Sequence, residues 1–237
     1  MRRKNARRIV FVCKNHQSGI NDSISDNIII TEKNPSEVIM NLKKSKTYEN
    51  LARSYAGECQ AYVRYKFIEY GARKQGLACL AEMIDNVAFN EFQHARMFYT
   101  FIQQADKNTI DNIDICGGYP FKEKWDLTEN LRFAAEDEEN EETNIYPTFA
   151  RIAREEGFDE IAALYDNIIQ VESCHKKLFT DLYEQLKNGT LYKKQEKVKW
   201  KCADCGYEAE GYEPWTKCPF CEAEQGRVML KLTQEQE

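Results

Sequence analysis

The chain has 237 residues, of which 42% are hydrophobic and 30% charged, and a formal net charge of −6. This composition is ordinary for a globular protein, and the length allows one or two domains with a buried core. The acidic balance and the lack of a basic patch interleaved with aromatic residues argue against nucleic acid as the main partner. No apolar run approaches the roughly 20 residues that a membrane-spanning helix needs, so we expect no membrane association.

The N-terminal segment, residues 1–39, lacks sustained periodicity and is rich in Asn, Ser, Lys and Ile. It starts with the basic sequence MRRKNARR, but the apolar run that follows, IVFVC, is too short for a signal peptide. We therefore expect a cytoplasmic protein. Two interpretations stay open for this segment. It is either a poorly ordered extension or untranslated sequence ahead of a true start at Met40, which opens directly onto the helical region.

Residues 40–190 are predicted to form an all-α domain. Apolar positions recur at steps of three and four residues, as on a helix with one buried face, in four segments: 51–65, 80–101, 131–152 and 161–182. Gly76 and Gly157 predict a tight turn inside each of two hairpins. The connection between the hairpins, about 106–126, is long, which is typical of a ferritin-like four-helix bundle. We expect Pro147 to kink the third helix.

The second hairpin repeats the first at a spacing of 81 residues, and each copy carries the pattern Glu-x-x-His, as Glu91-x-x-His94 and Glu172-x-x-His175. Further pairs match at the same spacing: Tyr65 with Tyr146, Ala72 with Ala153, Arg73 with Arg154, Gly76 with Gly157, Asp85 with Asp166, and Asn86 with Asn167. A duplicated hairpin with one such motif in each copy indicates a two-metal carboxylate site inside a four-helix bundle.

Five carboxylates occupy positions that their helices otherwise devote to the core: Glu58, Glu91, Glu138, Glu141 and Glu172. Burying them unpaired would cost several kcal/mol each, and the inward faces hold too few Lys or Arg residues to neutralise them. Metal cations would neutralise them. Glu139 is expected to point away, although the 81-residue spacing would pair it with Glu58. Tyr55, Tyr62 and Phe101 are among the aromatic residues expected to face inward.

The spacing of the ligands and their chemistry indicate which metal would bind. Residues three apart on a helix project from one face, roughly 5–6 Å apart, so a Glu-x-x-His pair can serve one metal or bridge to its neighbour. An oxygen-rich set with one imidazole per metal suits iron or manganese rather than structural zinc.

The C-terminal region after Gly189 is predicted to be a polar linker, residues 191–197, and a small domain, residues 198–237. Cys202-x-x-Cys205 and Cys218-x-x-Cys221 are separated by twelve residues and predict a tetrahedral sulfur site for iron or zinc. A domain of this size needs such a metal for stability. The remaining cysteines are expected to be free thiols: Cys13, Cys59, Cys79, Cys116 and Cys174.

These motifs together resemble those of the rubrerythrin family. The resemblance rests on AGECQA at 56–61 with Arg64-Tyr65, NEFQHA at 90–95, EDEENE at 136–141 followed by Tyr146-Pro147, Glu172-x-x-His175 and the two cysteine pairs. It runs from about Met40 to Leu232 and implies a ferritin-like bundle followed by a small, metal-stabilised, rubredoxin-like β domain. Asp137 departs from the family pattern, since Gly is usual at that position, and Glu222 stands where free-standing rubredoxins carry Gly.

The resemblance implies a peroxidase that reduces hydrogen peroxide to water. Its two-iron centre would be held by Glu58, Glu91, His94, Glu138, Glu141, Glu172 and His175, with Glu138 bound in the diferric state and His94 in the diferrous state. Tyr65 and Tyr146 would hydrogen-bond ligand carboxylates, unless they are only core aromatics.

The same resemblance implies that one iron in the four-cysteine site passes electrons from a separate NADH-dependent reductase or a rubredoxin. The chain has no nucleotide-binding fingerprint of its own. A homodimer would bring the sulfur-bound iron of one subunit near the two-iron centre of the other. Two other functions stay open: a ferritin-type ferroxidase or iron-storage protein, and a non-catalytic module with a zinc ribbon.

Overall fold

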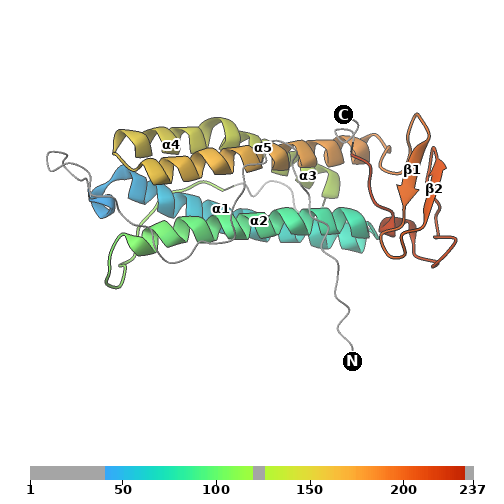
Figure 1. Cartoon of the computed structure of the whole chain (residues 1–237), viewed down its shortest axis with the longest axis horizontal. Coiled ribbons are helices and arrows are strands. Elements are labelled where there is room, and N and C mark those ends of the chain that lie inside the picture. Colours follow the sequence, from blue (N-terminus) through green and yellow to red (C-terminus); the bar gives the residue numbers. More distant parts are fainter. Residues whose placement is uncertain (1–40, 120–125, 233–237) are drawn as a thin grey trace, which may run out of the picture.

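The computed structural model describes residues 41–119 and 126–232, so the prediction for residues 1–39 lies outside the described part of the chain. Two long helical hairpins lie side by side and form a four-helix bundle (Figure 1). This confirms the predicted ferritin-like fold. The helical elements of the bundle are, in chain order, η1 (Leu42–Lys44), α1 (Lys46–Lys74), α2 (Ala78–Gln104), α3 (Leu127–Asn140), η2 (Glu141–Ile145), α4 (Tyr146–Glu155) and α5 (Asp159–Lys187).

The ends of the hairpins follow local backbone chemistry. Gly76 and Gly157 adopt φ values of 76° and 82°, the left-handed conformation that glycine tolerates best, and each closes its predicted turn. The Ser45 side chain caps α1 by accepting a hydrogen bond from the Tyr48 amide. The Glu156 carboxylate, beside the second turn, accepts hydrogen bonds from the first amides of α1 at 2.9 and 2.8 Å. This contact joins the second hairpin to the start of the first.

The third helix is interrupted by a π segment, η2, directly before Pro147. The Tyr146 amide donates to the Glu141 carbonyl, five residues earlier, and Pro147 stands in the first turn of α4, where its missing N–H costs nothing. The expected kink is therefore a π bulge, which inserts one residue into the helix. It also changes the repeat: the fully buried Leu51 and Leu131 lie 80 residues apart, whereas Tyr65 and Tyr146 lie 81 apart.

Two apolar clusters fill the bundle on either side of its middle. One, near the Gly76 turn, contains Leu80, Ile84, Leu131, Phe179 and Leu182. The other, toward the opposite end, contains Leu51, Phe98, Ile161, Tyr165 and Ile168. The bundle therefore packs as two hydrophobic cores separated by a central layer.

The expectation that Tyr55 faces inward is wrong, because its side chain is 37% exposed. Ser54 takes the interior position instead, and its hydroxyl lies 3.1 Å from the Tyr165 hydroxyl. Tyr55 packs against Tyr99 on the outer surface, with ring centroids 5.5 Å apart. Tyr62 and Phe101, also expected to face inward, are only partly buried. Leu51 begins the inward face of α1 as predicted, and the face continues through Ser54 rather than Tyr55 to Glu58 and Tyr65.

The C-terminal domain lies against the end of the bundle that carries the Gly76 turn (Figure 1). It contains an antiparallel pair, β1 (Val198–Lys201) and β2 (Glu208–Gly211), and the short helix η3 (Gln225–Arg227). Gly226 of η3 approaches the bundle so closely that an added Cβ would lie 1.7 Å from the Gly76 carbonyl oxygen. Arg227 forms ion pairs with Glu82 of α2 and with Asp204 of its own domain. The domain is thus docked on the first hairpin by shape and by charge.

Among the described residues, no helix is both long and apolar enough to cross a bilayer.

Candidate metal centres

The layer between the two apolar cores is built from charged side chains of four helices. Glu58 comes from α1, Glu91 and His94 from α2, Glu138 from α3, and Glu172 and His175 from α5. All six are at most 4% exposed. Glu141, the seventh predicted ligand, is the first residue of the π segment and is only partly buried.

Six of these side chains form two overlapping groups whose ligand atoms lie within 4.8 Å of one another. One group is Glu58, Glu91, His94 and Glu172, and the other is Glu91, Glu138, Glu172 and His175. Glu91 and Glu172 belong to both groups, so each is placed to bridge two metal ions. Each metal position is completed by one further carboxylate and one imidazole. Glu141 belongs to neither group.

The imidazoles point their Nδ1 atoms at the two shared carboxylates. His94 Nδ1 lies 3.1 Å from Glu91 Oε2 and 3.0 Å from Glu172 Oε1. His175 Nδ1 lies 2.9 Å from Glu91 Oε1 and 2.8 Å from Glu172 Oε2. The two rings are 6.0 Å apart between centroids. The halves of the site are therefore related by an approximate twofold symmetry that follows the sequence repeat.

Four fully buried carboxylate oxygens in this layer accept no hydrogen bond: Glu58 Oε2, Glu91 Oε1, Glu138 Oε2 and Glu172 Oε1. An imidazole Nδ1 atom lies within 4 Å of each, but that one nitrogen faces three carboxylates at once and cannot donate to all of them. Buried polar atoms of this kind are rare and costly unless a cation satisfies them. One such oxygen comes from each of the four carboxylates in the two groups. The donor set, rich in oxygen with one nitrogen per metal, fits two iron ions.

Electrostatics also favour a cation at this place. Burial and the neighbouring charges of Glu91 and Glu172 raise the pKa of Glu138 to about 8. Burial, only partly offset by His94, holds the pKa of Glu58 well above its ordinary value. Glu58 and Glu138 would thus take up protons unless a positive charge lay beside them. Burial alone would also raise the pKa of Glu91 and Glu172, but the neighbouring imidazoles lower both.

Two buried tyrosines connect the halves of the site in a reciprocal way. Tyr65 of the first hairpin donates a hydrogen bond to Glu138 of the second, and Tyr146 of the second donates to Glu58 of the first. Both rings are 1% exposed. Because the π bulge adds one residue after Glu138, Glu58 and Glu138 are equivalent ligands although they are 80 residues apart. Glu139 is exposed, as expected.

Sequence reasoning missed two contacts at the site. Asn90 Nδ2 lies 3.1 Å from His175 Nε2, on the ring edge opposite the carboxylates, and so holds the orientation of this imidazole. Arg64 forms an ion pair with Asp137 next to the Tyr65–Glu138 hydrogen bond. The only signal in the sequence was adjacency, since Asn90 precedes Glu91 and Asp137 precedes Glu138.

Glu141 lies near the half of the site that contains Glu58. Burial raises its pKa well above the ordinary value, and among the neighbouring charges that of Glu58 contributes most, ahead of that of Glu138. The charges of both Glu58 and Glu138 act on this carboxylate, so it is close to the metal layer without belonging to either ligand group.

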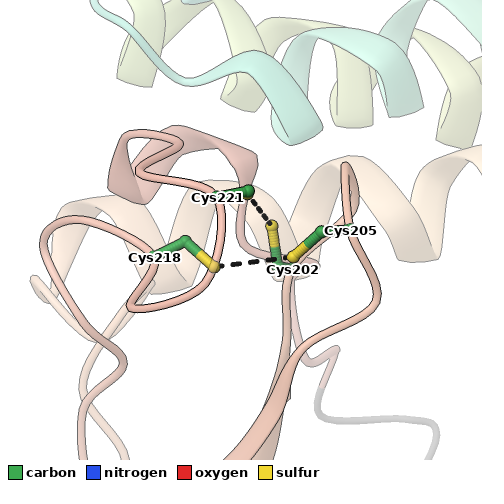
Figure 2. A group of neighbouring side chains, drawn as sticks. All are labelled: Cys202, Cys205, Cys218 and Cys221. Carbon is green, nitrogen blue, oxygen red and sulfur yellow. Dashed lines mark hydrogen bonds between the residues drawn. The ribbon is translucent and has the colours of Figure 1, made fainter.

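The four cysteines of the C-terminal domain converge on one point (Figure 2). Cys202 Sγ lies 3.7 Å from Cys221 Sγ, and Cys205 Sγ lies 3.6 Å from Cys218 Sγ. A cage of four thiolates of this size fits one iron ion. The second pair closes although Glu222 replaces the usual Gly, because Glu222 itself adopts the left-handed conformation with a φ of 62°. Such a conformation costs a non-glycine residue roughly 1 kcal/mol.

The described cysteines outside this cage belong to neither candidate metal site. Cys59, Cys79 and Cys116 are free thiols, as expected. Cys174 is disulfide-bonded, so the expectation of a free thiol at this position is wrong. Cys13 lies outside the described residues.

Comparison with known proteins agrees with this arrangement. The family model described as rubrerythrin matches residues 49–183. Rubrerythrin of Clostridium perfringens is 42% identical over 76% of this chain and 91% of its own length, and rubrerythrin of Nitratidesulfovibrio vulgaris is 35% identical over the same shares. A solved structure of nigerythrin in a mixed-valence state covers 85% of this chain and 98% of its own, with a TM-score of 0.52 at 24% identity, which supports the fold. The chain therefore belongs to the rubrerythrin family and is a diiron oxidoreductase of oxidative-stress protection with a rubredoxin-like four-cysteine iron domain.

Proposed function

We propose that the protein is a peroxidase that reduces hydrogen peroxide to water. Two ferrous ions, when bound, would supply the two electrons that convert one peroxide and two protons into two water molecules. The observation that carries the proposal is the pair of overlapping ligand groups that share Glu91 and Glu172, on a chain that also has a four-cysteine group suited to iron. A ferritin-type ferroxidase or iron store has no need of returning electrons.

In this proposal the protein positions two metals and keeps them in place while their charge changes. Glu91 and Glu172 would hold both ions, since each belongs to both ligand groups. Tyr65 and Tyr146 hold the remaining carboxylates by hydrogen bonds, and Asn90 orients His175. Burial excludes water and strengthens each of these interactions.

One ligand is proposed to change with redox state, and the arrangement favours Glu141 for this role rather than Glu138. Glu138 is the counterpart of Glu58, belongs to a ligand group and is held by Tyr65. Glu141 belongs to neither group and is the first residue of a π bulge, and among the neighbouring charges it feels most strongly that of Glu58, which shares a ligand group with His94. π bulges often occur at functional sites. We propose that Glu141 and His94 alternate as ligands of one metal, with Glu141 bound in the diferric state.

Electron return is proposed to involve a second subunit. The docked C-terminal domain contacts the start of α2, and Glu91 lies 12 residues beyond Cys79 of that helix, which corresponds to about 18 Å. This separation along α2, between the docked C-terminal domain and the bundle centre, is long for fast electron transfer within one chain. The external donor is proposed to be a separate NADH-dependent reductase or a rubredoxin.

The outer face of the first hairpin supplies a surface for a homodimer. Seven of the nine large hydrophobic side chains that are exposed among the described residues lie on it: Tyr55, Val63, Phe67, Tyr70, Phe89, Phe92 and Tyr99. The 29-residue α1 is about 43 Å long, so two adjacent helices offer the roughly 800 Å² per partner of a standard interface. A cytoplasmic location remains a prediction.

Stopped-flow mixing of the fully reduced, iron-loaded protein with peroxide tests the proposal. We expect oxidation of both centres within seconds at two equivalents of peroxide per chain, which accept more than the three electrons that three ferrous ions hold, and slower oxidation by dissolved oxygen at the same concentration. Preference for oxygen together with a cage-sized assembly would instead indicate a ferritin-type ferroxidase. A colourless protein with zinc in the four-cysteine site would indicate the zinc-ribbon alternative.

A further inference from the structure

An ion pair lies next to one half of the metal layer and has no counterpart at the equivalent positions of the other half. Arg64 of α1 and Asp137 of α3 are neighbours in sequence of Tyr65 and Glu138, so two contacts between the same helices lie side by side. Each side chain of the pair is only 21% exposed. The two charges are therefore less accessible to water and salt than those of an ordinary surface ion pair, so their interaction is weakened less by the solvent.

The repeat within the chain allows an internal comparison. The position equivalent to Arg64 in the second hairpin is Ile145, and the position equivalent to Asp137 in the first is Gly57. The opposite half of the site keeps its tyrosine–glutamate hydrogen bond without an ion pair at these equivalent positions, since neither Ile145 nor Gly57 carries a charge. The charges are thus not needed to hold a tyrosine on its ligand, and they make the two metal positions electrically unequal.

The surroundings of Arg64 show what its charge acts on. Its Nε atom is buried without an acceptor among the described residues, and its Cζ lies 5.6 Å from the centre of the Tyr65 ring. Burial by itself would lower the pKa of the guanidinium, but Tyr65, Asp137 and then Glu141 raise it overall. Without Asp137, a full positive charge would stand beside the Glu138 half of the site.

We propose that Asp137 sets the reduction potential of the iron pair by neutralising Arg64 at the edge of the metal layer. The inference rests on the proposed diiron function. A positive charge near the site destabilises two ferric ions more than two ferrous ions, and a negative charge has the opposite effect. Removing either member of the pair should therefore shift the potential, in opposite directions.

A redox titration of the iron-loaded, full-length protein tests this. The protein is poised with mediators against dithionite, which supplies two electrons per diiron centre and is itself oxidised to sulfite. Asp137→Asn should shift the diiron potential upward, and Arg64→Gln should shift it downward. Each shift should change the ratio of reduced to oxidised centres at fixed potential by roughly three- to tenfold. Arg64→Gln/Asp137→Asn should return close to the original value.

The matched control is Asp166→Asn, which removes the partner of Arg154 in an exposed ion pair and should leave the potential unchanged. Arg64→Lys keeps the charge and should retain the original potential, which covers the case in which Arg64→Gln does not fold. Iron content, measured for every variant, must stay at that of the unmodified protein.

Unchanged potentials in both single variants, or shifts of the same sign, would overturn the inference and leave the pair a purely structural contact. The proposed peroxidase function is refuted by a different outcome. A protein whose potentials shift as expected but whose reduced form does not react with peroxide would refute the peroxidase and keep the role of Asp137.

Discussion

The two candidate metal centres of this protein are assembled in different ways. The four-cysteine cage takes its ligands from two short segments of one small domain, and Cys202 and Cys221, its outermost members, are 19 residues apart. The carboxylate layer takes ligands from four helices, and in the sequence Glu58 and His175 are separated by most of the residues of the bundle. The first centre depends on local turns. The second depends on the packing of two complete hairpins, so substitutions should affect the two centres independently.

The largest effect should come from Glu91→Ala. Glu91 belongs to both ligand groups, so we expect the iron content of the bundle to fall from two ions to nearly none, while the four-cysteine iron stays. Metal analysis with a visible spectrum measures both. Glu139→Gln is the control, because Glu139 is exposed and its loss should leave three irons per chain. Retention of two bundle irons in the Ala variant would contradict the bridging role.

The converse change is Cys218→Ser. Loss of one thiolate should empty the C-terminal cage and unfold the small domain, because a domain of this size lacks a sufficient core. The bundle should keep its two irons and its helical circular dichroism. Reaction of the reduced bundle with peroxide should persist for one turnover, while steady-state turnover with an external reductase should fall by at least roughly 100-fold. Unchanged steady-state turnover would show that electrons reach the bundle by another route.

An intermediate effect is expected from Tyr65→Phe and Tyr146→Phe. Each removes a hydroxyl that hydrogen-bonds one ligand carboxylate, and loss of such a contact typically weakens metal binding roughly 10- to 100-fold. Iron release to a chelator should be faster in both variants. Because the two contacts are equivalent under the repeat, the two rates should be similar. Tyr165→Phe, whose hydroxyl lies by Ser54 instead, is the control with unchanged release.

The smallest effect is expected from Glu222→Gly in the cysteine domain. Glu222 has a φ of 62°, a conformation in which glycine is less strained, so the domain should gain roughly 0.5–1 kcal/mol of stability. Loss of the visible absorption of the sulfur-bound iron on heating reports this domain, and its midpoint should rise. Helical unfolding of the bundle should not move. A lowered midpoint would show that the Glu222 side chain itself contributes to the domain.

Much of the bundle centre could be predicted from the sequence, because helical periodicity alone assigns Glu58, Glu91, Glu138 and Glu172 to buried faces. The imidazoles followed from the repeated Glu-x-x-His pattern. The four-cysteine cage was simpler still, since both pairs of ligands are local. The periodicity argument gave the wrong residue at Tyr55. The predicted inward face stepped four residues to Tyr55, whereas Ser54, one residue earlier, occupies the interior.

The sequence by itself determined the ligand types, the duplicated hairpin and the separate sulfur site, because these are written in spacings of a few residues. Only the tertiary structure decided which carboxylate serves which metal position. A π bulge advances the third helix by one residue, a shift of about 100° around its axis that depends on backbone hydrogen bonds and packing. The same packing brings Tyr65 to Glu138 and Arg64 to Asp137 across 73 residues. No local pattern predicts such contacts, because they exist only when both hairpins are folded against each other.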